Sequence, residues 1–174
     1  MAGGIIVKKF KWFAVLVACI LFIIAGFLIY EYGTVCDLNR HIDVSGVKFL
    51  MEDNKVEETL NSIGKPTKGF GISGYFFEKE QLEVEFIYHG LFAHKATAIT
   101  SSNPAHNIYG IHIGDSYKSA VYKLNINGFR TESYGSDRFI KKFICVTLNP
   151  VINDTNIRKV RVEINSWTPF KVIY

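Results

Sequence analysis

The feature that most limits how this chain can fold is an uninterrupted apolar run near its N-terminus. From Trp12 to Tyr30, nineteen residues pass without a charged side chain. In a helix that rises about 1.5 Å per residue they span about 28 Å, close to the hydrocarbon thickness of a bilayer. The sequence therefore predicts a transmembrane helix over residues 12–32.

The charges on the two sides of this run predict its orientation. Lys8, Lys9 and Lys11 precede it, whereas Glu31 follows it. Because positively charged flanks stay in the cytoplasm, we expect a single-pass signal anchor in the cell membrane, with the N-terminus inside and the C-terminal domain outside the cytoplasm. A cleaved signal peptide is the alternative, although its apolar region is usually about 7–15 residues.

The basic character of the chain is concentrated at this end. Of the formal net charge of +4, three units come from the lysines before the helix, and the part after residue 32 carries only +2. Acidic and basic residues are interspersed along that outer part, which is typical of a solvated surface and not of the basic stripe that binds nucleic acid. We expect the membrane and an envelope or extracellular protein as partners, and no nucleic acid.

An offset of 64 residues relates two stretches of the outer part. It aligns residues 45–49 with residues 109–113 and then continues without a gap, and most of the paired residues are glycines or core-type residues, as in a duplicated scaffold. The pairs are Gly46 with Gly110, Val47 with Ile111, Phe49 with Ile113, Leu60 with Leu124, Gly64 with Gly128 and Thr67 with Thr131.

Each half contains the signature of one short amphipathic helix. In the first half Val56, Leu60 and Ile63 have helical spacing. Asn54 and Glu57, three residues apart at the start of this segment, have the spacing of a capping box. The second half repeats the helical spacing, with a cap and a glycine that closes the helix. Its residues are Tyr117, Val121 and Leu124, with Asp115 or Ser116 as the cap and Gly128 as the end.

Strand patterns follow each helix. Leu82, Val84 and Phe86 alternate with polar residues in the period of two that is typical of a half-buried strand. The predicted strands cover residues 75–78, 82–88 and 96–100 in the first half, and 138–142, 143–148 and 160–164 in the second.

These patterns together predict an α+β fold, in which an N-terminal transmembrane helix precedes two tandem repeats of a helix and antiparallel strands. The predicted organisation is a cytoplasmic basic tail at 1–11, the transmembrane helix at 12–32, a linker at 33–43, the first repeat at 44–107 and the second repeat at 108–174.

Two short motifs carry a resemblance to known proteins. They are Gly64-Lys65-Pro66 at the end of the first helix and Gly110-Ile111-His112-Ile113-Gly114-Asp115-Ser116 before the second. With the aromatic hairpin between them, residues 44–166 resemble the repeat of the beta-lactamase inhibitor proteins and of the BamE-like envelope lipoproteins. The resemblance implies a non-enzymatic binding or scaffolding module.

Side chains that could carry chemistry are scattered along the chain. The histidines lack the closely paired ligands of a zinc site and are expected to be solvated loop residues. Cys145 lies in an apolar strand pattern, where a buried thiol is expected. We therefore expect no catalytic residues, no metal and no cofactor, and the chain is not expected to be an enzyme.

The resulting hypothesis is a membrane-anchored module that binds another protein by contact. Aromatic anchors dominate interface energetics, so the candidate partner-binding residues are those of one connection and one residue of the opposite half: Tyr88, His89, Phe92, His94 and Tyr134. Two alternatives stay open at this point. One is an envelope enzyme whose site assembles from distant residues, and the other is a membrane-tethered immunity or inhibitor protein.

Overall fold

The computed structural model describes residues 3–67, 72–87, 94–151 and 154–164. The chain divides into two compact units, Met1–Leu38 and Asn39–Tyr174, and each is described by itself.

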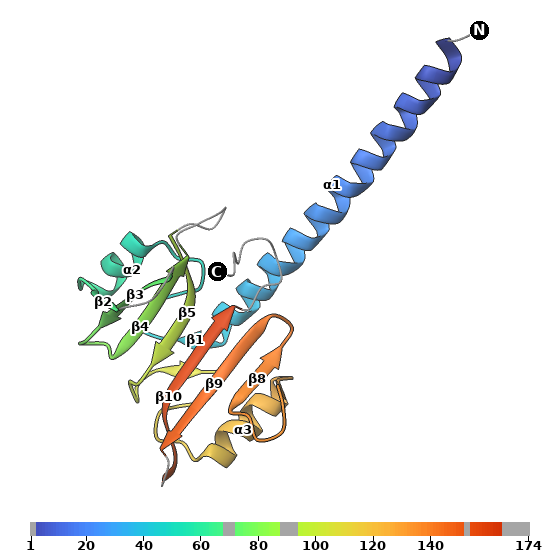
Figure 1. The fold of residues 1–174 in the computed structure, drawn as a ribbon. Coiled ribbons are helices and arrows are strands. Elements are labelled where there is room, and N and C mark those ends of the chain that lie inside the picture. The colour runs from blue at the N-terminus through green and yellow to red at the C-terminus, as the bar shows by residue number, and fades with distance from the viewer. Residues whose placement is uncertain (1–2, 68–71, 88–93, 152–153, 165–174) are drawn as a thin grey trace. The chain divides into compact units, whose positions relative to one another are not determined.

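The first unit consists of most of helix α1, which runs from Gly3 to Arg40 (Figure 1). Its stretch from Trp12 to Arg40 is long and apolar enough to cross a membrane, and among the described residues it is the one helix that is. Large side chains such as Phe22 and Ile29 are exposed there, unlike those of a core helix. The predicted apolar helix is thus confirmed as an anchor or a signal, and it continues to Arg40, through residues for which a linker was predicted.

The second unit is α+β, as predicted, and is built on one eight-stranded antiparallel sheet (Figure 1). The strand order is β2-β3-β4-β5-β10-β9-β8-β7. The strands are β2 (Lys65–Thr67), β3 (Ile72–Phe77), β4 (Leu82–Ile87), β5 (Lys95–Ser101), β7 (Arg130–Thr131), β8 (Arg138–Lys141), β9 (Ile144–Val151) and β10 (Asp154–Ile164). The long predicted strands are therefore present, with ends that differ by a few residues.

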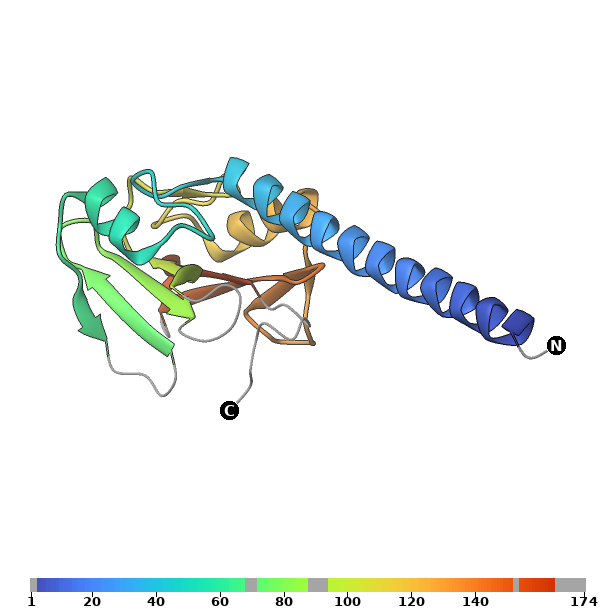
Figure 2. The same ribbon diagram turned by 90° about the horizontal axis from the view of Figure 1, so that it is seen from above.

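Two short helices, α2 (Asp53–Leu60) and α3 (Tyr117–Ile126), lie on one face of this sheet (Figure 2). Val56 and Leu60 of α2, and Ala120 and Leu124 of α3, are buried. A separate two-stranded pairing joins β1 (Ile42–Asp43) to β6 (Asn107–Ile108). The core of the unit therefore lies between the helices and the apolar face of the sheet.

The alternation of apolar and polar residues in the sequence matches the alternation of buried and half-exposed side chains in the strands. In β4, Leu82, Val84 and Phe86 are buried while the residues between them are half-exposed. In β10, Val160 and Val162 are buried in the same way. Burying one large aliphatic or aromatic side chain contributes about 1.5–3 kcal/mol, so this alternation fixes which face of each strand packs against the helices.

The turn before each helix contains two residues with positive φ, a backbone conformation that few residues other than glycine adopt. Ser45 and Gly46 have φ angles of 57° and 81°, and Tyr109 and Gly110 have 54° and 80°. Glycine reaches positive φ at no steric cost, which explains its place in both turns. The polar residue before the first glycine and the aromatic residue before the second bear the less favourable conformation.

Two details of the predicted first helix are wrong. The helix ends at Leu60, because Asn61 takes the left-handed conformation at the C-cap, so Ile63 lies beyond it and is 85% exposed. The expected capping box is also absent, because the N-cap is Glu52 and the Glu57 carboxylate accepts the Gly64 N–H instead. In the second helix Ser116 is the cap, as expected, and its Oγ accepts the Ser119 N–H at 3.2 Å.

Strands β5 and β10 join the two halves at the centre of the sheet. Val162 of β10 is opposite Ile99 of β5. On the other face of these strands the Arg161 guanidinium donates to both oxygens of Glu85, with the Nη2 to Oε2 distance at 2.8 Å, and to Glu163 at 3.0 Å and 3.1 Å. The pairing with Glu85 raises the pKa of Arg161 further above its usual value.

Candidate functional site

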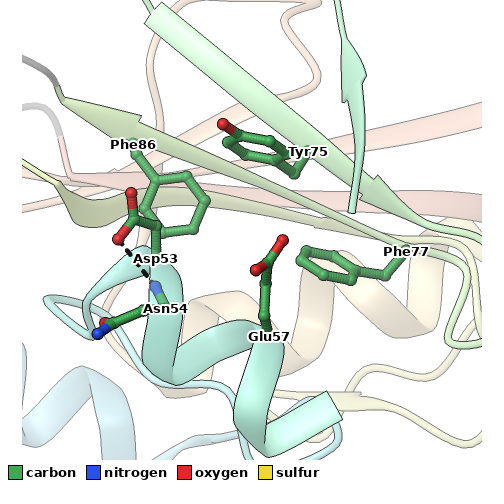
Figure 3. Close-up of a pocket in the computed structure, with 6 residues that line it drawn as sticks. All are labelled: Asp53, Asn54, Glu57, Tyr75, Phe77 and Phe86. Atoms are coloured by element: carbon green, nitrogen blue, oxygen red, sulfur yellow. Dashed lines mark hydrogen bonds between the residues drawn. The ribbon is translucent and has the colours of Figure 1, made fainter. Parts of the chain in front are cut away.

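A pocket of about 200 Å³ lies between α2 and the hairpin of β3 and β4 (Figure 3). One wall is the polar side of α2 and the other is aromatic. It is lined by Asp53, Asn54 and Glu57 from the helix, and by Tyr75, Phe77 and Phe86 from the strands. The charged groups among these six residues are two carboxylates. We call the pocket lined by these six residues the acid–aromatic pocket.

Local geometry explains why the two carboxylates share this pocket. Asp53 and Glu57 are four residues apart on α2, so they lie on the same side of the helix. The Glu57 carboxylate points towards the rings of Tyr75 and Phe77 (Figure 3). The rings of Tyr75 and Phe86 meet edge to face, with centroids 5.9 Å apart. The carboxylates of α2 thus lie next to aromatic rings of β3 and β4.

Hydrogen bonds hold both carboxylates in place. Asp53 Oδ1 accepts the Asn54 N–H at 2.8 Å, and Asp53 Oδ2 lies 3.1 Å from Nδ1 of His94. Glu57 Oε1 accepts the Gly64 N–H at 3.3 Å. A carboxylate can accept about four hydrogen bonds, so each group keeps acceptor capacity for a further donor.

The predicted partner-binding residues fall into three groups. Tyr88, His89 and Phe92 lie outside the described residues. His94 is exposed, has a φ of 63° and contacts Asp53, so it lies next to the acid–aromatic pocket. Tyr134 is fully exposed in the connection between β7 and β8. Their role in binding stays a prediction.

The expectation that the histidines are solvated is wrong for His106, which is only 5% exposed. Its Nε2 lies 2.8 Å from Ser45 Oγ, and its Nδ1 lies 2.7 Å from Ser101 Oγ. The connection that holds it leads into β6, which pairs with β1 and not with the large sheet, and the sequence pattern did not indicate this pairing.

The proton positions around His106 follow from its partners. Ser45 Oγ donates its proton to the Glu80 carboxylate at 2.8 Å, so it must accept from Nε2–H of His106. Nδ1 is then the acceptor for the Ser101 hydroxyl. Burial lowers the pKa of His106, which keeps the ring neutral. In this tautomer Nε2 cannot take a proton from Ser45, so the cluster is a hydrogen-bonded support for the turn.

The three cysteines differ in exposure, since Cys19 is exposed, Cys36 is half-buried and Cys145 is buried. Cys145 is completely buried, as expected, and burial raises the pKa of its thiol. Cys19, Cys36 and Cys145 are free. Within the described ranges no cluster of three or more His, Cys, Asp or Glu side chains could hold a metal ion.

The acid–aromatic pocket is not predicted by the sequence pattern. Local patterns predict Glu57 in a capping box and Phe86 in a half-buried strand. The signal that was present is the spacing of two carboxylates, Asp53 and Glu57, on one side of a helix whose opposite side is apolar. Which strands face that helix is a long-range property that no local pattern contains.

Comparisons with known proteins give little by which to classify the chain. No protein-family model and no curated protein matches the sequence. A similar solved structure is that of an extracellular protein containing a SCP domain from Bacillus anthracis str. Ames, with a TM-score of 0.49 and 7% sequence identity. The match covers 64% of this chain and 42% of that chain, so it spans less than half of the other protein.

The expected resemblance to the beta-lactamase inhibitor proteins and BamE-like lipoproteins is therefore wrong, since the solved structure found to match is the SCP-domain protein. The physical reason lies in the motif that suggested it. Gly110 and Gly114 have φ angles of 80° and 97°. Glycines with this spacing serve a tight turn before a capped helix, which many unrelated folds require.

Proposed function

We propose that this chain is a single-pass membrane protein that presents its α+β domain outside the cytoplasm and there binds an envelope or extracellular protein without catalysis. The topology is supported by the apolar helix and by Lys8, Lys9 and Lys11 before it. Protease added to intact cells should then digest the domain and spare the N-terminal tail. A domain that is digested only after the cells are opened would refute this orientation.

The observation that carries the binding role is the acid–aromatic pocket. It combines fixed charge with aromatic surface, the two features through which a domain anchors a side chain of a partner. Its volume of about 200 Å³ is below the roughly 300–1,000 Å³ of pockets that take cofactors and drug-sized ligands. A group of side-chain size therefore suits it better than a cofactor.

Photocrosslinking in intact membranes tests this role. A photoreactive amino acid at His94, next to the pocket, or at Tyr134 is expected to give a discrete crosslinked product with another protein. Tyr122 provides the matched control, because it is an exposed tyrosine on α3, away from the predicted positions. Equal crosslinking from all three positions, or none from His94 and Tyr134, would count against a specific partner at these positions.

We further propose that the domain consists of two tandem repeats. The support is the sheet order, in which β2 to β5 and β7 to β10 occur as mirror-ordered series around the central pair. The starts of α2 and α3 differ by 64 residues, and so do the turns at Gly46 and Gly110. In an experimental structure the Cα atoms of the two halves should superpose at this offset through the helix. Superposition only at a different offset would refute a simple duplication.

A further inference from the structure

We propose that the acid–aromatic pocket binds one alkylammonium group, such as the end of a lysine side chain or of a small amine. The lysine case rests on the proposed binding of a protein partner, whereas the amine case does not. The pocket offers a cation negative charge, hydrogen-bond acceptor oxygens and an aromatic ring.

Charge selects the class of ligand. The charged groups that line the pocket, Asp53 and Glu57, are both carboxylates, so an anion would be repelled and a cation attracted. A bare metal ion is a poor match, because within the described residues no group of three or more acidic, histidine or cysteine side chains is arranged to hold one, and His94 already contacts Asp53 directly. A cation with its own N–H donors is the remaining class.

The aromatic wall favours an organic cation. Phe77 and Phe86 are each 1% exposed and form the closed base of the pocket, so the aromatic surface open to a ligand is that of the half-buried Tyr75. An ammonium group near the Tyr75 ring gains a cation–π interaction, and its methylene groups gain apolar contact. The carboxylates above the rings can accept charge-assisted hydrogen bonds from the same nitrogen.

The carboxylates are oriented before any ligand arrives. Glu57 is held by the Gly64 N–H, and Asp53 by the Asn54 N–H and by His94. Gly64 also lets the strand approach closely, since a Cβ at this position would lie 2.6 Å from Tyr75 Cβ. A preformed site loses less conformational freedom on binding than a flexible one.

The fold itself does not require these acidic groups. In the first two turns of α3, the positions that match Asp53 and Glu57 at an offset of 64 residues are Tyr117 and Val121. The second half forms the same kind of helix over the same sheet without a carboxylate at either position. The acid pair is therefore a property of the first half alone, as expected of a site and not of a scaffold.

The test uses the full chain in nanodiscs of zwitterionic phosphatidylcholine, labelled with 3-fluorotyrosine. The ¹⁹F resonance of Tyr75 is assigned from its loss in Tyr75→Phe. The probes are N-acetyl-lysine methylamide and n-butylamine, and N-acetyl-norleucine methylamide is the uncharged control. We expect both amines to shift the Tyr75 resonance saturably with a millimolar dissociation constant, and the norleucine compound to leave it unchanged.

Matched variants localise the effect. Glu57→Gln keeps an oxygen acceptor for the Gly64 N–H but removes the charge, and it should weaken amine binding about tenfold. Glu58→Gln removes the same charge from the neighbouring exposed residue, which does not line the pocket, and should leave binding within about twofold. Equal weakening by both variants would show general surface attraction and overturn the assignment of the site.

The probes also distinguish the two sources of the ligand. Binding of the lysine compound at least tenfold tighter than butylamine supports a lysine of a protein partner, and equal binding supports a small free amine. No saturable shift with either amine, or the same shift with the norleucine compound, overturns the proposal. Neither result depends on membrane topology or on crosslinking, so a failure here is distinct from a failure of the proposed function.

Discussion

The ion pair at the centre of the sheet gives a quantitative test of how the two halves are held together. In Arg161→Met the guanidinium is lost, while most of the aliphatic length of the side chain is kept. Five hydrogen bonds disappear, two to Glu85, two to Glu163 and a long one of 3.5 Å to the Thr100 hydroxyl. Glu163 keeps the Arg138 guanidinium at 3.2 Å, so Glu85 loses the most.

The magnitude follows from burial. Removing one partner of a fully buried ion pair costs about 3–5 kcal/mol, and an exposed pair contributes about 0–1 kcal/mol. The Arg161 side chain is 27% exposed and the Glu85 side chain 19%, which lies between these cases but nearer the first. We expect Arg161→Met to lower the free energy of unfolding by about 2–3 kcal/mol. For a domain of this size that lowers Tm by about 6–9 °C.

The assay is thermal unfolding of the full chain in nanodiscs, followed by near-ultraviolet circular dichroism of the domain's tyrosines. Lys65→Met is the control, because Lys65 and Glu78 form an ion pair between strands in which each side chain is 70% exposed. Its Tm should change by less than about 2 °C. If both variants lost the same stability, burial would not determine what an ion pair contributes here.

A second variant separates the pair from the unpaired charge that it leaves. Glu85→Gln in the Arg161→Met background replaces the abandoned carboxylate by a neutral amide. Part of the loss should then be recovered, about 1 kcal/mol, because a neutral group is cheaper to leave partly buried. A double variant no more stable than Arg161→Met would show that the loss comes from packing and not from charge.

Three further predictions concern single positions. Burial lowers the pKa of His106 below its ordinary 6.5, so its contribution to stability should be complete above about pH 6.5 and decrease as the pH falls towards the lowered value. Urea midpoints measured at several pH values should therefore fall more steeply with acidification for the native chain than for His106→Gln. Gly64→Ala should lower Tm, because the new Cβ would lie 2.6 Å from Tyr75 Cβ and force β3 to move, at a cost of about 1–3 kcal/mol that a melting curve would detect. Ser116→Ala should cost about 1 kcal/mol through the lost cap, whereas an equal cost from Ser119→Ala, measured in the same denaturant titration, would argue against capping as the cause.

The regular elements of the domain were predictable because their signals are local. Leu82, Val84 and Phe86 show the period of a strand, and Val56 with Leu60 shows that of a helix, so burial on one face fixes both. The end of α2 was misplaced because the spacing of Ile63 continues the helical period, while Asn61 stops the helix by its backbone conformation. A local backbone choice overrode the hydrophobic pattern.

The candidate site was not predictable in the same way. The acid–aromatic pocket needs Glu57 to face Tyr75 and Phe77, and that contact depends on how the helix lies on the sheet. The buried state of His106 depends on Ser45, which is 61 residues away in sequence. Composition and spacing describe neighbours along the chain, whereas these sites are made by residues that meet only after the sheet has formed.

The central pairing of β5 with β10 has a consequence for how the domain is made. Strand β5 ends at Ser101, and its partner is complete only when Ile164 has been synthesised. At about 5–20 residues per second, the inner edge of β5 waits roughly 3–13 seconds for that partner. During that interval an unpaired strand edge is open to other nascent chains. We therefore expect the newly made chain to need a chaperone that covers this edge until β10 has been synthesised. Depletion of such a chaperone should raise the insoluble fraction of newly made chain in a pulse-labelling experiment.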